Sequence, residues 1–276
     1  MQNKQQIASF RKEISTARIA LENRYWANEP IGELLKTHSN HIDGILSKIW
    51  DLYFLPETSS ALYAVGGYGR EELHPYSDID LLVVSETLVK DQSNIEGFLR
   101  NVFDLNLEIG HSVRDPQSCL EEAKKDISVA TSLYERRFIT GNHKTTELIT
   151  KSLETADLWP TSEFFSAKLQ EQKARHKHFD DSEYNLEPNV KASPGALRDV
   201  HTVLWICHKK FNTTDPTELV GLTVLTEQEK DWLIKGRDFL WWVRFGLHLL
   251  AKRKEDRLTF SYQRELASKF SQTEEN

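Results

Sequence analysis

The stretch at residues 61–84, ALYAVGGYGREELHPYSDIDLLVV, constrains the fold of this 276-residue chain more than any other part of it. Two short runs of apolar and β-branched residues, at 59–66 and 78–85, flank a segment that contains glycine, proline and serine. Runs of this kind, bounded by turn residues, are typical of strands. We therefore expect two strands joined by a glycine turn and a loop, with two carboxylates at the start of the second strand.

The two carboxylates, Asp78 and Asp80, occupy alternate positions of the second predicted strand. Alternate side chains of a strand share one face, so both carboxylates are expected to point the same way. Two carboxylates held side by side repel each other unless a cation lies between them, and Mg²⁺ binds carboxylate and phosphate oxygens. Two such ions can activate an attacking oxygen and stabilise a leaving one. The pattern therefore favours phosphoryl or nucleotidyl transfer.

Three glycines precede the carboxylates: Gly66, Gly67 and Gly69. Glycine lets the backbone approach an anion closely, so the N–H groups of this turn can bind a triphosphate. Arg70 adds a forked donor for phosphate oxygens. Other phosphate-binding motifs fail by inspection, because the chain has no G-x-x-x-x-G-K-[ST], and Glu72 stands where G-x-G-x-x-G needs its last glycine. The sequence gives no support to a P-loop or a dinucleotide-binding fold.

Helices are expected on both sides of these strands. Apolar residues recur three and four positions apart at 2–26 and at 31–54, which is the helical period. The same spacing returns at 94–105, between the second strand and a third strand predicted at 107–114. The centre of the chain is therefore a mixture of strands and helices.

After the third strand only helices are predicted. Asp115 and Pro116 supply the N-cap and the first-turn proline of one helix, and no strand pattern appears from Ile127 onward. The later helices are predicted at 127–139, 161–179, 195–211 and 227–254. The first of these is expected to end at Gly141, where we place a domain boundary. The predicted fold class is α+β, with strands and helices at residues 1–140 and an all-helical domain at residues 141–276.

Composition limits the cellular compartment and the classes of partner that this chain is expected to have. The chain has 35 Lys and Arg against 42 Asp and Glu, so no diffuse positive field is expected to hold a long RNA or DNA. Cys119 and Cys207 are too few for a disulfide framework or a Cys-rich zinc site, which fits a reducing cytoplasm. The first twenty residues lack the pattern of a signal peptide, and no stretch reaches the roughly 18 apolar residues of a membrane span. We expect a cytoplasmic protein that binds neither membranes nor long nucleic acids.

The pattern of Gly66-Gly67, ten intervening residues and then Asp78-Ile79-Asp80 resembles the signature of the DNA-polymerase-β-like nucleotidyltransferase superfamily. Members of that superfamily usually carry a third carboxylate on a later strand. Glu108 is the candidate, since it falls early in the third predicted strand and Gly110, two residues later, leaves room beside it. The resemblance implies a polymerase-β-like sheet flanked by helices, in which the three carboxylates hold Mg²⁺ or Mn²⁺.

Further stretches narrow the resemblance to one family. The runs GGYGREELHPYSDIDLL, LEIGHSVR, SEYNLEPNVKASPGALRDVHTVLW and RFGLHLL are similar to the amino-terminal part of bacterial PII uridylyltransferase/uridylyl-removing enzymes. This resemblance implies transfer of UMP from UTP to a tyrosine of the PII signal protein, with release of pyrophosphate. It also implies that the glycine turn and Arg70 bind the phosphates, while Mg²⁺ is held by the carboxylates.

The chain departs from the expected family pattern at three positions. Gly67 stands where a serine is common, Glu71 stands where a glycine is expected, and Ala196 replaces a second glycine. Arg198 and His201 are predicted to share one face of a helix, and that face could close over the nucleotide. A structural pair of Arg198 with Asp199 is the alternative.

Other side chains are assigned structural roles. His74, before Pro75, is expected to shape the loop, and His111 is expected to be buried on the face opposite to Glu108. The tryptophans of the last predicted helix are expected to pack inside the protein: Trp232, Trp241 and Trp242.

Members of the family also carry an HD phosphohydrolase domain and ACT domains. None of the ten histidines here is followed by aspartate, so we expect transfer of UMP without its removal by this chain. Two alternatives stay open. The segment 195–199, GALRD, is similar to glutamine synthetase adenylyltransferase, so glutamine synthetase or another acceptor is one of them. The other is a catalytically inactive nucleotide-binding regulatory module, although a module that only binds has less need of paired carboxylates.

Overall fold

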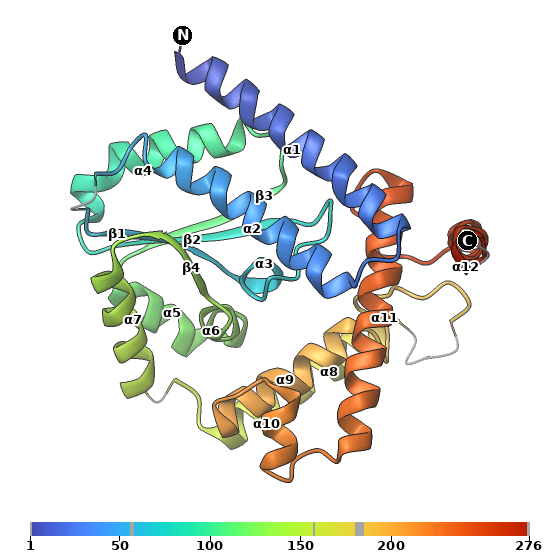
Figure 1. Ribbon diagram of the computed structural model, residues 1–276. Coiled ribbons are helices and arrows are strands. Elements are labelled where there is room, and N and C mark those ends of the chain that lie inside the picture. Colours follow the sequence, from blue (N-terminus) through green and yellow to red (C-terminus); the bar gives the residue numbers. More distant parts are fainter. Residues whose placement is uncertain (1, 56–57, 157, 180–184, 275–276) are drawn as a thin grey trace. The chain divides into compact units, whose positions relative to one another are not determined.

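The computed structural model describes residues 2–55, 58–156, 158–179 and 185–274. Of the family-like run SEYNLEPNVKASPGALRDVHTVLW, at residues 182–205, the first three residues lie outside the described residues. The chain divides into two compact units (Figure 1). The first comprises residues 1–24 and 32–158, and the second comprises residues 25–31 and 159–276.

The first unit is built on a four-stranded sheet. Its strands are β1 (Ser60–Ala64), β2 (Ile79–Ser85), β3 (Ile109–Arg114) and β4 (Arg137–Gly141), in the order β3-β2-β1-β4. β1 is antiparallel to both of its neighbours, and β2 is parallel to β3. The three predicted strands are confirmed, and with them the α+β class.

Helices pack on both faces of this sheet (Figure 1). They are α1 (Gln2–Trp26), α2 (Ile31–Trp50), α3 (Gly66–Gly69), α4 (Leu88–Phe103), α5 (Pro116–Lys125), α6 (Ile127–Tyr134) and α7 (His143–Thr155). Side chains of α1, α2 and α4 bury one face of the sheet together with Ile79, Leu81 and Val83 of β2. Since alternate side chains of a strand point to opposite faces, Asp78 and Asp80 belong to the face that α5, α6 and α7 cover.

The predicted helix at 127–139 is wrong in its second half. α6 ends at Tyr134, and residues 137–141 form β4, which pairs with β1. Phe138, Ile139 and Thr140 are aromatic or β-branched, and β1 supplies the backbone partners that a strand needs. The helical spacing of the preceding residues led to the prediction of one long helix. The strand itself leaves no local pattern in the sequence, because it forms by pairing with a segment more than seventy residues earlier.

The division between the units also differs from the predicted boundary after residue 140. α7 lies in the first unit, where Thr145 Oγ1 donates to the Ser59 carbonyl at 3.0 Å and the Tyr63 and Thr146 hydroxyls are 2.8 Å apart. β4 and α7 thus extend the first unit to Leu158.

The second unit is helical. Its helices are α8 (Thr161–His178), α9 (Leu197–Phe211), α10 (Pro216–Gly221), α11 (Glu227–Ala251) and α12 (Phe260–Glu274). Tyr25 stacks on Trp242 and Phe245 of α11, with ring centroids 5.5 and 5.1 Å apart. The described residues of this unit contain no strand beyond an isolated bridge between Asn189 and Arg257. None of the helices in the described part of the chain has the length and apolar character needed to cross a membrane.

Candidate active site

The three predicted carboxylates lie at one end of two neighbouring strands. Asp80 pairs with Gly110 in the parallel register of β2 and β3, and the Ile79 N–H donates to the Glu108 carbonyl at 2.8 Å. Asp78 and Glu108 lie two residues before this pair, so all three carboxylates belong to the same face of the sheet. Asp78 and Asp80 are half-buried, and Glu108 is exposed.

The Asp80 carboxylate lies against the backbone of two glycines. A Cβ at Gly110 would be 2.4 Å from Asp80 Oδ1, and a Cβ at Gly66 would be 3.3 Å from Asp80 Oδ2. Gly66 also has a φ of +59°, which L side chains rarely adopt. The two glycines therefore make the space that this carboxylate occupies, and they place the start of α3 beside it.

The turn of α3 is fixed to the sheet by backbone hydrogen bonds. The Val65 N–H donates to the Asp80 carbonyl at 3.0 Å. Within the turn, the Gly69 N–H donates to the Val65 carbonyl at 3.0 Å and the Arg70 N–H donates to the Gly66 carbonyl at 3.1 Å. The first N–H groups of any helix have no partner within that helix. This backbone is compatible with the predicted contact of Gly66 and Gly67 with phosphate.

The other two glycines of the turn play different parts. A Cβ at Gly69 would be 2.2 Å from the Glu135 carbonyl oxygen and 3.0 Å from that of Ala64, so Gly69 is needed for packing against the end of α6. A Cβ at Gly67 would meet only Arg70 Nη2, at 3.7 Å, which is an ordinary contact. The position of Gly67 thus has room for the serine that is common in the superfamily.

Arg70 is held by two carboxylates. Its Nη1 bonds Glu135 Oε1, and its Nη2 bonds Glu72 Oε2 at 2.9 Å. Burial alone would lower the pKa of Arg70, but Glu72 and Glu135 outweigh it and hold that pKa above its ordinary value. The ion pairs tie the turn of α3 to the end of α6. Sequence reasoning missed both partners, and a direct contact of Arg70 with phosphate stays a prediction.

A second polar network connects the turn to α2 and β4. Arg137 of β4 forms an ion pair with Asp43 of α2, and the Tyr68 hydroxyl donates to Asp43 Oδ1. Arg137 Nη2 also donates to the Tyr68 carbonyl at 3.3 Å. Burial and the Asp43 charge raise the pKa of Tyr68, so its phenol stays neutral. Sequence reasoning could not find this network, because it depends on β4.

Glu71, where a glycine is expected, has a φ of +60°. A left-handed backbone suits glycine better than any other residue, so the conformation itself explains that expectation. Burial alone would lower the pKa of Arg137, but Asp43 outweighs it and holds that pKa above its ordinary value, and the negative charge of Glu71 adds to this effect.

Two histidines near the site had predicted structural roles, and the structure agrees with the prediction for His74 and contradicts that for His111. His74 is buried and its Nδ1 lies 3.0 Å from the Glu72 carbonyl, as expected of a residue that shapes the loop. His111 is exposed rather than buried, and its ring contacts Phe103 edge-on at 5.3 Å. The reason is that β3 is an edge strand of the sheet, with most of its side chains partly exposed.

In the second unit, Asp199 at the start of α9 is a structural anchor. It accepts hydrogen bonds from Arg175 and Gln172 of α8 and from the Gly195 N–H, and His176 Nε2 lies 3.0 Å away. Arg198 lies over the Trp205 ring, 5.3 Å from its centroid. A contact of Arg198 with the nucleotide stays a prediction.

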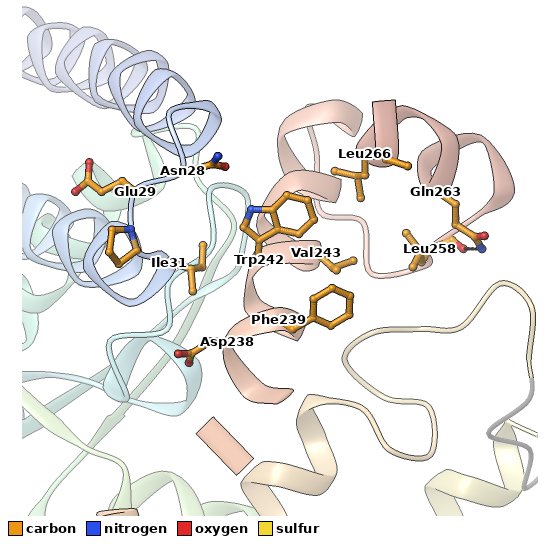
Figure 2. A pocket seen from close by; sticks show the side chains of 12 residues that line it. Asn28, Glu29, Ile31, Asp238, Phe239, Trp242, Val243, Leu258, Gln263 and Leu266 are labelled. Atoms are coloured by element: carbon orange, nitrogen blue, oxygen red, sulfur yellow. Dashed lines mark hydrogen bonds between the residues drawn. The ribbon is translucent and has the colours of Figure 1, made fainter. Parts of the chain in front are cut away.

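The second unit also contains an apolar pocket of about 630 Å³ (Figure 2). Trp242 and Phe239 line it, and its charged lining residues are the acids Glu29 and Asp238. A lining of this kind suits no phosphate chain. Of the tryptophans predicted to pack inside the protein, Trp241 is buried, Trp242 lines the pocket and Trp232 is 63% exposed, so the prediction is wrong for Trp232.

In the described part of the chain, no three His, Cys, Asp or Glu side chains form a cluster that could hold a metal ion as they are placed. The chemistry of the donors nevertheless suits Mg²⁺, because Asp78, Asp80 and Glu108 offer carboxylate oxygens alone. Their role as metal ligands is therefore a proposal, carried by residue type and strand register.

Comparison with known proteins gives matches over most of the chain. The family described as "Nucleotidyltransferase domain" matches residues 43–151, which include the sheet and all three carboxylates, and the family described as "GlnD PII-uridylyltransferase" matches residues 163–276. The chain is 44% identical over 265 residues to the bifunctional uridylyltransferase/uridylyl-removing enzyme of Pseudomonas fluorescens (strain SBW25), covering 95% of this chain and 29% of that enzyme. The enzyme of the same name from Pseudomonas aeruginosa (strain LESB58) is 44% identical over 267 residues, covering 96% and 30%. The chain thus spans about 30% of the length of these curated relatives.

Replacing Arg70 with methionine is expected to destabilise the first unit by about 3–5 kcal/mol, because the buried carboxylates of Glu72 and Glu135 would both lose their ion pair with Arg70. Chemical denaturation measures the loss. The control is Lys48→Met, which removes a surface ion pair with Glu13 and should cost at most about 1 kcal/mol. Equal stabilities of the two variants would show that the Arg70 ion pairs do not fix the turn.

Proposed function

The chain belongs to the PII-uridylyltransferase family, and on this premise we propose that it transfers UMP from UTP to a tyrosine of the PII signal protein and releases pyrophosphate. The proposal includes a cytoplasmic location, Mg²⁺ or Mn²⁺ as the cofactor, and PII and UTP as the partners. The names of the relatives support the uridylyl group, and the nucleotidyltransferase match supports the reaction type.

The position of Asp80 carries the proposal. Its carboxylate lies between the glycine turn that starts α3 and the backbone of β3, with Asp78 two residues away on the same face of the sheet. A triphosphate bound at the turn would bring its oxygens next to these carboxylates. Such a juxtaposition of anions requires divalent cations, and nucleotidyl transfer uses them.

Each part of the site has a definite task in this reaction. Asp78, Asp80 and Glu108 would hold Mg²⁺, which supplies positive charge to the phosphate oxygens as negative charge builds up on them. The N–H groups of Gly66 and Gly67 bind the phosphate chain and orient it. The tyrosine oxygen then loses its proton to solvent and forms a bond to the α-phosphorus, and the bond from this phosphorus to the bridging oxygen breaks to release pyrophosphate.

The direct test is transfer of label from α-labelled UTP to purified PII in the presence of Mg²⁺. Asp80→Asn and Asp78→Asn are each expected to slow transfer by about two to three orders of magnitude, the scale on which loss of one electrostatic stabiliser acts. The matched control is Asp51→Asn, at an exposed position outside the site, which should transfer at the wild-type rate. An unchanged rate in Asp80→Asn would remove this carboxylate from the mechanism.

Parallel reactions with ATP and glutamine synthetase test adenylyl transfer.

Gly110→Ala is expected to slow transfer by about a hundredfold, the cost of a displacement of roughly 1 Å at a reacting centre, because the new Cβ displaces Asp80. Mn²⁺ affinity, measured by electron paramagnetic resonance, should fall with it. Gly44→Ala in α2 is the matched control, since nothing lies within 4 Å of its Cβ and the change should stabilise the helix by up to about 1 kcal/mol. Wild-type transfer by Gly110→Ala would contradict the placement of Asp80.

A further inference from the structure

The exposed side of α11 carries two large aromatic side chains. Trp232 and Phe239 are each 63% exposed. They lie seven residues apart, which is close to two helical turns, so both point to the same side of the helix. Lys235 and Gly236 lie between them on that side and are exposed as well. These four residues are called here the α11 face, and neighbouring aromatic side chains in water are typical of a surface that binds a partner.

The α11 face leads into the apolar pocket of the second unit (Figure 2). Phe239 belongs to both, and Trp242 and Val243 continue the lining along α11. Leu266 of α12 lines the pocket as well. Its volume of about 630 Å³ lies within the roughly 300–1,000 Å³ of pockets that hold a small ligand. The pocket therefore has room for the indole ring of a tryptophan.

Gly236 stands between the two aromatic residues, at a position where the fold of this chain does not require a glycine. A Cβ added there would have nothing of the described chain within 4 Å. Glycine destabilises the interior of a helix relative to alanine. It also lets another backbone approach closely, because it has no side chain. Gly236 is therefore the point of the α11 face at which a second helix can come nearest to α11.

The charges along one flank of α11 suit a second copy of the same helix. Lys235 is exposed, and no ion pair of its ammonium group occurs within the described residues. Arg237 donates through Nε and Nη2 to the same oxygen of Asp238, Oδ1, at 3.0 and 2.8 Å. The other oxygen, Oδ2, accepts no hydrogen bond from the described part of the chain. An ammonium group and a carboxylate oxygen thus stand three residues apart on one flank of the helix.

Two α11 helices that run antiparallel about a two-fold axis bring these features into register. With the axis passing just after Gly236, positions equally far from that point lie level with each other. Lys235 then lies level with Asp238 of the second copy, and the two-fold axis keeps the same flanks of the two helices together. Trp232 lies level with the part of α11 that lines the pocket of the second copy. Each of these contacts occurs twice in such an arrangement.

We propose that the chain forms a two-fold symmetric dimer through the α11 face, in which Trp232 of each copy enters the apolar pocket of the other and Lys235 pairs with Asp238. The partner is a second copy because the ring and the pocket, and the ammonium group and the carboxylate, all stand on one chain at matching positions. An interface of this kind closes at two copies. The inference does not rest on the proposed function, since it uses no residue of the candidate active site.

Sedimentation equilibrium of the whole chain, at concentrations up to about 1 mM, tests the dimer. The wild type is expected to pass from monomer to dimer, and Trp232→Ser to weaken association by at least about tenfold, as for an aromatic residue that anchors an interface. The matched control is Val89→Ser in α4, which removes an apolar side chain that is 89% exposed and should associate as the wild type does. A wild type that stays monomeric, or equal association of Trp232→Ser, would overturn the proposal.

Charge reversal tests the register of the two helices. Lys235→Glu and Asp238→Lys are each expected to weaken association, because like charges would then face each other twice. The double variant restores opposite charges and should recover most of the affinity. Lys173→Glu at an exposed position of α8 is the control and should associate normally. A double variant that associates no better than either single variant would contradict the antiparallel register.

Gly236→Ala separates the interface from a merely structural role of this helix. The substitution should raise the melting temperature of the monomer, because alanine favours the helix, and yet weaken the dimer, because the new Cβ stands where the two helices cross. Gly44→Ala, at an equally open position of α2, should raise the melting temperature without any effect on association. Unchanged association of Gly236→Ala would show that the helices do not cross at this residue.

Failure of this inference and failure of the proposed function give different results. Asp80→Asn should lose transfer to PII and still form the dimer, since Asp80 lies outside the α11 face. A chain that transfers UMP but stays monomeric would refute the dimer alone. A chain that dimerises through Trp232 but transfers nothing to PII would refute the proposed function alone.

Discussion

The contact of the Asp80 carboxylate with the backbone of Gly66 and Gly110 is the constraint on which the rest of the first unit depends. It requires β3 to lie beside β2 in parallel, so that a residue without a side chain stands next to the acid. It also requires the chain to leave β1 in a left-handed conformation, which only glycine adopts readily. Both requirements bring a backbone that can bind anions up to a carboxylate that can bind cations. Transfer of a nucleotidyl group needs this combination.

The surroundings of the turn show how the fold holds such a contact in place. Arg70 joins the turn to α6 through Glu72 and Glu135, and Asp43 joins Tyr68 to Arg137. Buried ion pairs add little net stability, because removing charges from water costs about as much as their attraction returns. Their effect here is geometric, since each pair can form only when α2, β4 and α6 occupy their places around α3. Preorganised groups of this kind lower the cost of reaching a transition state.

Local patterns in the sequence predict the carboxylates at the centre of the proposed site but few of the contacts that support it. Strands were predicted at 59–66, 78–85 and 107–114, and the structure has them at 60–64, 79–85 and 109–114. These predictions were possible because alternation and turn residues act over a few positions. β4 could not be predicted, since its five residues become a strand by pairing with distant β1. The partners of Arg70 were missed for a related reason, as Glu135 is 65 residues away in sequence. The exposure of His111 follows from the position of β3 at the edge of the sheet, which alternation along one strand does not reveal.

A crystal structure of the chain with Mg²⁺ and a non-hydrolysable UTP analogue tests the central proposal most directly. The proposal predicts that Asp78 and Asp80 bind the ions within the 2.0–2.1 Å typical of Mg²⁺, that Glu108 turns toward them, and that the phosphates lie against the N–H groups of Gly66 and Gly67. A nucleotide bound elsewhere, with the Asp80 carboxylate still seated between its two glycines and no ion upon it, would contradict it.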